Sequence, residues 1–226
     1  GGATLQFSAI PMNLLGGGSA DYVVTGAWSQ KAFAEAQRIA PVLGGRVRLA
    51  GSTEESGFTR APRPEELSLD PNARYVHVCT NETIHGVEWL ELEALQASGV
   101  PLVADMSSHL LSRPIDVRRF GLIYAGAQKN IGPAGLTLVI VRRDLMASPW
   151  EGTPPVLRYD RMAENGSMLN TPPTFAIYVA GLVFQWLESL GGLAAMAQRN
   201  EAKARLLYEC IDATPFYRNA VEPHWR

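Results

Sequence analysis

Short apolar runs without alternating polar positions limit the folds open to this chain. LIYAGA at 122–127 and TLVIV at 137–141 are apolar on both faces, which is typical of strands buried in a parallel sheet. Helical segments separate them from further expected strands, an order that indicates βαβ units. The sequence therefore predicts an α/β fold with a mostly parallel central sheet and helices on both faces. The further strands are expected at 20–25, 46–50, 75–80 and 100–106.

Lys129 follows the run LIYAGA, at the start of a glycine-rich loop. The carboxyl ends of strands are where open α/β sheets bind ligands. A lysine held there beside a packed core is partly desolvated, which lowers the pKa of its amine and makes it a nucleophile able to form a Schiff base. A lone lysine is more often a solvated surface residue, so the prediction depends on its neighbours.

Asp105 lies near the end of the apolar run 100–106. If this run and 122–127 are parallel strands, Asp105 and Lys129 emerge at the same edge of the sheet. Pyridoxal 5'-phosphate requires these two groups, a lysine for its aldehyde and a carboxylate that keeps its pyridine nitrogen protonated. An aspartate after a strand is also a common turn residue, so neither residue decides the matter alone.

The chain contains three long ungapped motifs, ADMSSHLLSRPIDVRRFG, GAQKNIGPAGLTLVIVRRDL and NGSMLNTPPTFAIYVAGLVFQWL. They resemble the phosphoserine aminotransferases, a family of fold-type I, class V pyridoxal-phosphate enzymes. The likeness extends from the first residues to about Arg218. It implies transfer of an amino group between L-glutamate and 3-phosphohydroxypyruvate, giving O-phospho-L-serine and 2-oxoglutarate. It also implies a place in serine biosynthesis, with pyridoxine biosynthesis as a further role.

The resemblance assigns further residues to the cofactor. It implies that Trp28 stacks on the ring, although a tryptophan is more often a core residue, and that Thr83 lies near the phenolic oxygen. Lys129 and Asp105 carry the catalytic roles. The residues implied to hold the phosphate are Ala3, Thr4, Gln128, Asn170 and Thr171.

Two of these assignments need comment. Better-known members have Gly-Arg or Gly-Cys where this chain has Ala3 and Thr4, but backbone N–H donation survives that change. The resemblance implies that Asn170 and Thr171 reach the cofactor of the other subunit, and hence a homodimer.

Local signals predict helix starts near several of these residues. Gly1 and Gly2 are expected to open a helix, Ser29 to cap a helix over 30–40, and Thr171 to cap an apolar helix over 175–191.

The roles of three other polar residues stay open. His85 is not assigned as a base, because the lysine carries proton transfer in an aminotransferase and a loop histidine is more often solvated. Arg113 precedes a proline and is expected to brace the backbone. No role is assigned to His109.

Composition excludes several partners. A formal net charge of -2 favours neither nucleic acid nor an anionic membrane, and no apolar stretch is long enough to span a bilayer. Two distant cysteines, Cys79 and Cys210, suit a reducing compartment such as the cytoplasm and argue against a zinc site. No metal is expected.

The 226 residues are expected to form a cofactor-binding large domain over 1–191. Residues 192–226 then hold a linking helix over 193–213 and the start of a smaller domain, most of which is expected to be missing. Both ends look cut, which favours a fragment.

Two alternatives remain. The chain could be another fold-type I pyridoxal-phosphate enzyme, such as a different aminotransferase or a cysteine desulfurase. A desulfurase is disfavoured because it needs a mobile cysteine, and Cys79 ends an expected buried strand. The other alternative is a catalytically incomplete fragment that only binds the cofactor or dimerises.

Overall fold

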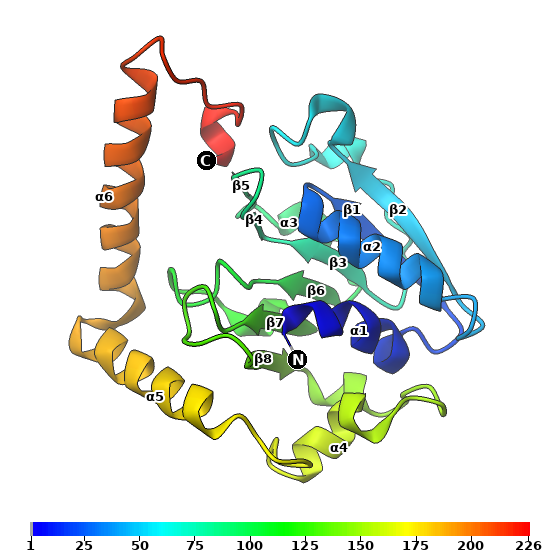
Figure 1. Cartoon of the computed structure of the whole chain (residues 1–226). Helices are drawn as coiled ribbons and strands as arrows, with labels where there is room; N and C mark the ends of the chain where they lie inside the picture. Colours follow the sequence, from blue (N-terminus) through cyan, green and yellow to red (C-terminus); the bar gives the residue numbers. More distant parts are fainter. Residues whose placement is uncertain (1) are drawn as a thin grey trace.

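A computed structural model describes residues 2–226; Gly1, expected to help open the first helix, lies outside the described residues. Its centre is a six-stranded sheet in the order β2-β1-β3-β6-β7-β8 (Figure 1). The strands are β1 (Ser19–Val24), β2 (Arg46–Ser52), β3 (Val76–Cys79), β6 (Leu102–Asp105), β7 (Leu122–Gly126) and β8 (Thr137–Val141). A separate antiparallel pair consists of β4 (Asn81–Glu82) and β5 (Val87–Glu88).

The burial of four adjacent central strands accounts for their unalternating apolar sequences. Every residue of β1, β3, β6 and β7 is buried, so both faces of these strands are covered. Their pairings with one another are parallel, as is that of β1 with β2. The expected parallel sheet is confirmed at these five strands.

The strand over 137–141 differs from its expectation. β8 pairs with β7 in the antiparallel direction and is only partly buried, because it forms the edge of the sheet. The short connection from Gly126 to Thr137 contains no crossover helix, and a parallel pair needs one. The prediction of a buried parallel strand was therefore wrong here.

Two helices cover one face of the sheet. α1 (Gln6–Leu14) and α2 (Ala27–Ile39) pack with their apolar sides on residues such as Tyr22, Tyr75 and Tyr124. A buried polar line runs through this layer. The Tyr22 and Tyr75 hydroxyls lie 2.8 Å apart, and His77 Nε2 lies 2.9 Å from the Tyr124 hydroxyl.

The opposite face of the sheet is covered by the short helix α3 (Glu93–Gln96), by connecting segments and by part of α5 (Thr174–Ser189). Leu95 of α3, Ile131 and Ala180 of α5 join a second core cluster with Val78 and Ile123. The expected α/β architecture, with a mostly parallel sheet and helices on both faces, is confirmed. The remaining short helix beside the sheet is α4 (Tyr159–Glu164).

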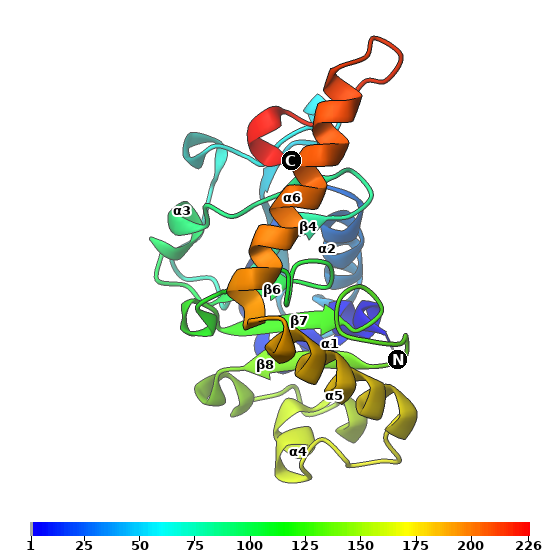
Figure 2. The same cartoon turned by 90° about the vertical axis from the view of Figure 1, so that its left-hand side faces the viewer.

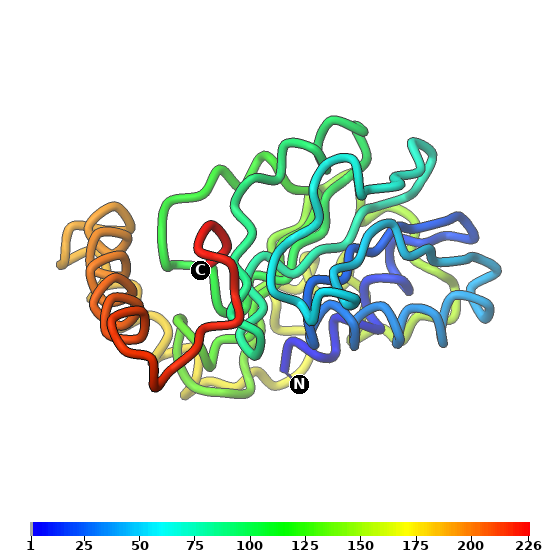
Figure 3. The backbone as a smooth tube through the Cα atoms, turned by 90° about the horizontal axis from the view of Figure 1, so that it is seen from above, coloured from blue at the N-terminus to red at the C-terminus, as the bar shows by residue number. Residues whose placement is uncertain are grey.

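Of the last two long helices, α5 packs on the sheet through Ala180, whereas α6 (Gly192–Asp212) stands apart from it (Figures 1 and 2). α5 leads through a bend to α6, and Figure 3 shows the chain returning from α6 to the body of the molecule. The return is fixed where Val221 is buried in the core and Glu222 N donates to Thr59 O at 2.9 Å. Among residues 2–226 no single helix has the length and apolarity to cross a membrane; only α5 and α6 together, bent by 85°, meet that test.

Two expected helix caps are wrong. α2 begins at Ala27, with Gly26 at its N-cap, so Ser29 lies within the first turn. α5 begins at Thr174 with Pro173 at its N-cap, so Thr171 is outside the helix.

The short 3-10 helices are η1 (Ala3–Leu5), η2 (Glu54–Ser56), η3 (Pro64–Glu66), η4 (Val117–Arg119), η5 (Arg143–Met146), η6 (Pro155–Leu157) and η7 (Pro223–Trp225).

A pair of isoleucines tests this account of the sheet. Ile123 of β7 faces Ile140 of β8 across the ladder, but Ile123 is 1% exposed and Ile140 is 37% exposed. We expect Ile123→Ala to lower the free energy of unfolding by about 2–5 kcal/mol, because it leaves a cavity. Ile140→Ala is the matched control and should cost about 1 kcal/mol or less. Urea unfolding measures both, and equal losses would contradict the assignment of β8 as a half-exposed edge.

Candidate active site

The expected site residues follow the carboxyl ends of the parallel strands. Asp105 is the last residue of β6, and Lys129 follows β7. Thr83 follows β4, the short strand after β3, and Trp28 lies in the first turn of α2, after β1. Because these strands are parallel, their carboxyl ends share one edge of the sheet. The strand order reverses between β1 and β3, and such a reversal point is where open α/β sheets bind ligands.

Asp105 is a buried carboxyl group with neutral hydrogen-bond donors. Ser107 donates to its Oδ1 twice, through Oγ at 2.6 Å and through N at 2.9 Å. Burial raises the pKa of Asp105, and the Ser107 bonds oppose that rise. Gly126 N donates to Ser107 Oγ at 3.0 Å, so Ser107 also joins the end of β6 to the end of β7.

Lys129 lies in a tight turn whose backbone is fixed from both sides. Ala127 and Ile131 are buried, and Ile131 N donates to Ala127 O at 3.0 Å across the turn. Lys129 itself is exposed. The expectation that its amine is desolvated beside the core is therefore wrong for this chain, because Ala127 and Ile131 fill the buried positions of the turn while Lys129 lies on its exposed side.

Gln128 is exposed and folds back over the strand end. Its side-chain amide lies where a Cβ on Gly126 would stand, with Oε1 2.6 Å from that position. The strand ends at Gly126, so Gln128 and Lys129 both lie beyond it, in the turn.

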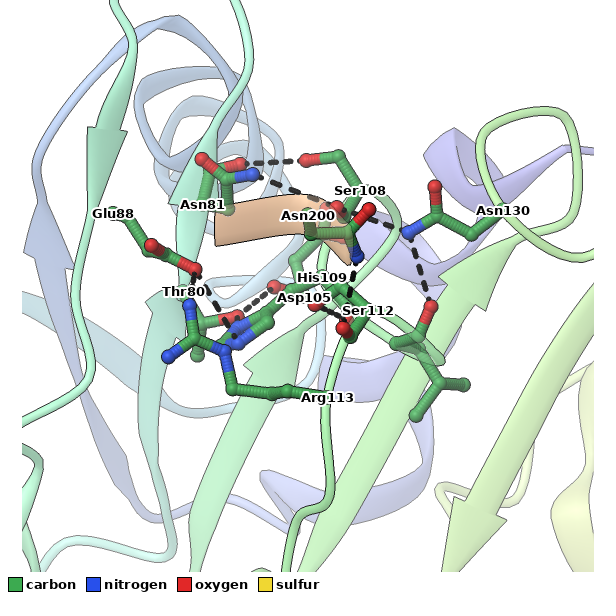
Figure 4. A network of polar contacts seen from close by, with 11 residues as sticks. Thr80, Asn81, Glu88, Asp105, Ser108, His109, Ser112, Arg113, Asn130 and Asn200 are labelled. Carbon is green, nitrogen blue, oxygen red and sulfur yellow. Dashed lines mark hydrogen bonds and ion pairs between the residues drawn. The ribbon is translucent and has the colours of Figure 1, made fainter. Parts of the chain in front are cut away.

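Ser108 connects three of the loops at this edge (Figure 4). Thr83 Oγ1 donates to Ser108 Oγ at 2.9 Å, and Ser108 Oγ donates to Asn81 O at 3.0 Å. Asn130, the neighbour of Lys129, donates from Nδ2 to Ser108 O and Leu110 O, both at 3.1 Å. These bonds hold the Thr83 loop, the segment after Asp105 and the Lys129 turn in one arrangement.

A second network of polar contacts begins at the backbone oxygen of Asp105 (Figure 4). His109 Nδ1 is 2.9 Å from Thr80 Oγ1, which lies 3.2 Å from the backbone oxygen of Asp105. Arg113 forms an ion pair with Glu88, rather than bracing the backbone as expected. Burial, followed by the charge of Arg113, lowers the pKa of His109 to about 4, so this imidazole is neutral at neutral pH.

Trp28 is held by residues that the sequence did not indicate. Glu82 Oε2 accepts a hydrogen bond from Trp28 N at 2.9 Å, and its Oε1 accepts one from Ser29 N at 2.8 Å. Because this carboxylate accepts from the first N–H groups of the helix, α2 begins at Ala27. That is earlier than the start expected from a cap at Ser29. His85 Nδ1 accepts from Ala27 N at 3.3 Å. The sequence could have indicated this role only through the acidic character of Glu82, which lies between a buried strand and Thr83. The helix start that Glu82 contacts is distant in the sequence.

The residues expected at the phosphate are less closely grouped. Ala3 and Thr4 begin η1, which contacts β7. Asn170 and Thr171 are exposed between α4 and α5. Within residues 2–226, no hydrogen bond joins that pair to Lys129 or Asp105. A polar hollow beside Arg46 and Arg74 lies at the opposite edge of the sheet, at the amino ends of the strands, and is separate from this site.

Comparison with known proteins adds the family. Residues 1–225 match the family described as aminotransferase class-V. The chain belongs to this family. Cys79, the residue that a desulfurase would need, is buried in β3, and burial raises the pKa of its thiol.

Among class-V aminotransferases, phosphoserine aminotransferases resemble this chain strongly. The chain is 66% identical over 221 residues to the phosphoserine aminotransferase of Aromatoleum aromaticum, covering 98% of this chain and 60% of the relative. The structure of a phosphoserine aminotransferase from Bacillus circulans subsp. alkalophilus superposes with a TM-score of 0.90 at 45% identity, covering 100% of this chain and 61% of that one. A pyridoxal-phosphate-bound phosphoserine aminotransferase from Trichomonas vaginalis gives 0.91 at 42% identity, covering 100% and 62%. The chain thus spans about 60% of the length of the curated relatives it matches.

The buried carboxyl group of this class-V chain predicts a pH effect. Because burial raises the pKa of Asp105, the folded protein binds this proton more tightly than the unfolded chain. Its contribution to stability is therefore present below pH 3.8 and lost as the pH rises through the folded-state pKa. We expect Asp105→Asn to be more stable than the parent at pH 7, with the difference shrinking toward pH 4, in urea unfolding of protein freed of small molecules.

Asp116 supplies a control of opposite sign. Its carboxylate accepts hydrogen bonds from Arg118, which lower its pKa, so its stabilising effect is present at neutral pH and lost on acidification. Asp116→Asn should therefore not be more stable than the parent at pH 7. A neutral-pH loss of stability in Asp105→Asn would contradict the assignment of Asp105 as a buried carboxyl group that is costly to ionise.

Proposed function

We propose that this chain is the cofactor-binding part of a phosphoserine aminotransferase. The reaction is transfer of an amino group between L-glutamate and 3-phosphohydroxypyruvate, giving O-phospho-L-serine and 2-oxoglutarate in serine biosynthesis. One observation carries the proposal. Asp105 is 5% exposed at the carboxyl edge of the sheet, the edge at which the exposed Lys129 also lies, and it has no ion-pair partner among residues 2–226. Burying an uncompensated carboxylate is costly, and a protonated ring nitrogen would compensate it.

The relatives support the substrate assignment. The curated proteins that match at 66% and 54% identity are both phosphoserine aminotransferases. The chain spans about 60% of their length, so the activity of the whole protein is inferred from them.

The residues at this edge suit pyridoxal 5'-phosphate. When bound, this cofactor supplies an electron-accepting ring and an aldehyde that exchanges amino groups. Lys129 Nζ would bind the aldehyde carbon and later carry the proton from the substrate Cα. Asp105 would retain the proton on the ring nitrogen. The exposure of Lys129 leaves its amine accessible to the aldehyde.

The remaining contacts would orient the cofactor. Trp28 would cover one face of the ring and exclude water from it, and Thr83 would lie near the phenolic oxygen. The N–H groups at the start of η1 would meet the phosphate, as helix N-termini do. The residues proposed for the phosphate are Ala3, Thr4, Gln128, Asn170 and Thr171.

A homodimer is part of the proposal. Asn170 and Thr171 are exposed, and they precede a helix with one strongly apolar exposed face. Exposed apolar patches of this kind mark interaction surfaces. A second copy of the chain would cover that face and receive Asn170 and Thr171 at its phosphate. The face consists of Phe175, Tyr178, Leu182 and Trp186.

The domain division and the location are also part of the proposal. The two core clusters fall almost wholly within 1–191, which supports that range as the large domain and 192–226 as the connection to a smaller one. Cys79 and Cys210 are both free thiols, which supports a cytoplasmic location. A further role in pyridoxine biosynthesis rests on the resemblance alone.

Chemical trapping tests the lysine assignment. The chain has three lysines, Lys31, Lys129 and Lys203. After incubation with pyridoxal phosphate and reduction with borohydride, peptide mapping by mass spectrometry should find the adduct on Lys129. Lys129→Ala should lose the adduct and turnover while remaining folded, and Lys203→Ala should retain both. An adduct on another lysine, or ordinary turnover without Lys129, would rule out the mechanism.

Mixing two inactive variants tests the shared site. One carries Lys129→Ala, and the other carries Asn170→Ala with Thr171→Ala. In a mixed dimer one site contains Lys129 from one subunit and both phosphate contacts from the other. Random exchange should therefore restore about a quarter of the parent activity at limiting cofactor. If mixing restores nothing although the subunits exchange, Asn170 and Thr171 do not serve the partner's site.

A further inference from the structure

We propose that Glu82 is a positioning residue that holds the Trp28 indole in place for the cofactor ring. Its buried carboxylate fixes the first turn of α2, and Trp28 belongs to that turn. The inference rests on the proposed function, in which Trp28 covers the ring.

The contacts of Glu82 are directed almost entirely at this turn. Glu82 is fully buried. Its Oε1 accepts hydrogen bonds from Ser29 N at 2.8 Å and from Ser29 Oγ at 2.5 Å, and its Oε2 accepts one from Trp28 N at 2.9 Å. Both carboxylate oxygens therefore satisfy backbone donors that every helix leaves free at its start.

Gly26 permits this approach. A Cβ on Gly26 would lie 2.6 Å from the Glu82 Cδ and 2.7 Å from its Oε2. The φ of Gly26 is 171°, which is extended backbone open to any residue. Glycine is needed here because the carboxylate occupies the space of a side chain, and the backbone of α2 is thereby brought against Glu82.

The indole of Trp28 is itself supported by neighbouring residues. Lys31 Nζ lies over the ring, 4.7 Å from the centroid of Trp28. This cation occupies one face of the indole, and the partly buried Trp28 also packs against the core cluster beneath α2, so its ring is held from more than one side. With its backbone fixed by Glu82 and one face covered by Lys31, Trp28 presents a defined surface.

Helix stability alone does not require this arrangement. A serine or aspartate at the N-cap would satisfy the same donors locally, whereas Glu82 is a buried carboxylate with no ion pair among the described residues. It reaches α2 from the segment that carries Thr83, across the point where the strand order reverses between β1 and β3. Glu82 therefore links two segments that are both proposed to contact the cofactor.

A double-mutant cycle on the full-length protein tests the inference. The dissociation constant of pyridoxal phosphate is measured by absorbance titration for the parent, Trp28→Ala, Glu82→Gln and the double variant. Loss of the stacking face should weaken binding about tenfold. Glu82→Gln should weaken it by a similar or smaller factor, because the amide nitrogen cannot accept from Trp28 N.

The decisive result is whether the two losses add. If Glu82 acts through Trp28, the double variant should bind no more weakly than Trp28→Ala alone. Additive losses would overturn the inference. They would point instead to Asp105, whose pKa is raised by burial and further by the charge of Glu82.

A second readout does not depend on the cofactor. In the protein without pyridoxal phosphate, hydrogen exchange of the Trp28 and Ser29 amides should be faster in Glu82→Gln than in the parent. Glu66→Gln is the matched control, because Glu66, the exposed last residue of η3, also accepts a backbone hydrogen bond, from Arg63 N at 2.7 Å. It should change neither the exchange of these amides nor cofactor binding.

The outcomes separate this inference from the proposed function. If the parent does not bind pyridoxal phosphate, or if Trp28→Ala binds it as tightly as the parent, the proposed function or its stacking residue is wrong. If Trp28→Ala weakens binding and Glu82→Gln does not, only the inference fails. Should Glu82→Gln not fold, Ser29→Ala replaces it in the cycle, because it deletes the 2.5 Å bond and keeps the carboxylate.

Discussion

The parallel pairing of β1, β3, β6 and β7 is the constraint on which the rest of the structure depends. Parallel strands deliver their carboxyl ends to one edge, so residues far apart in the sequence meet there without any direct attraction between them. Asp105 reaches this edge on β6, and Lys129 follows the neighbouring β7. The strands are buried on both faces, which makes their register costly to change.

The loops at this edge are fixed by hydrogen bonds as well as by apolar packing, because Met106, Leu110 and Ile131 belong to a buried core cluster. Ser107 and Ser108 tie the end of β6 to the Lys129 turn and to the Thr83 loop, while Glu82 ties the Thr83 loop to the start of α2. The bonds of Glu82, Ser107 and Asn130 satisfy buried or partly buried groups whose burial would otherwise cost free energy. The edge therefore combines a rigid sheet with a connected set of polar contacts, which suits a ligand that must be held by several groups at once.

The sequence predicted those features that depend on local pattern. Unalternating apolar runs located the buried strands, and the position of Asp105 and Lys129 after two such runs predicted their common edge. The direction of β8 was missed because its apolar pattern matches that of a parallel strand, although the short connection before it was an available signal.

Features that depend on distant partners were not predictable in the same way. Ser29 looked like a helix cap because serine often is one, but the acceptor that starts α2 is Glu82, on another segment. The exposure of Lys129 depends on which segments cover the end of β7, and no residue near Lys129 indicates that.

A crystal structure of the full-length protein grown with pyridoxal phosphate tests the central claim most directly. The account predicts that Lys129 Nζ is joined to the aldehyde carbon, and that the ring nitrogen lies about 2.7–2.9 Å from the Asp105 carboxylate. A cofactor bound at another lysine, or a ring nitrogen that faces away from Asp105, would contradict it.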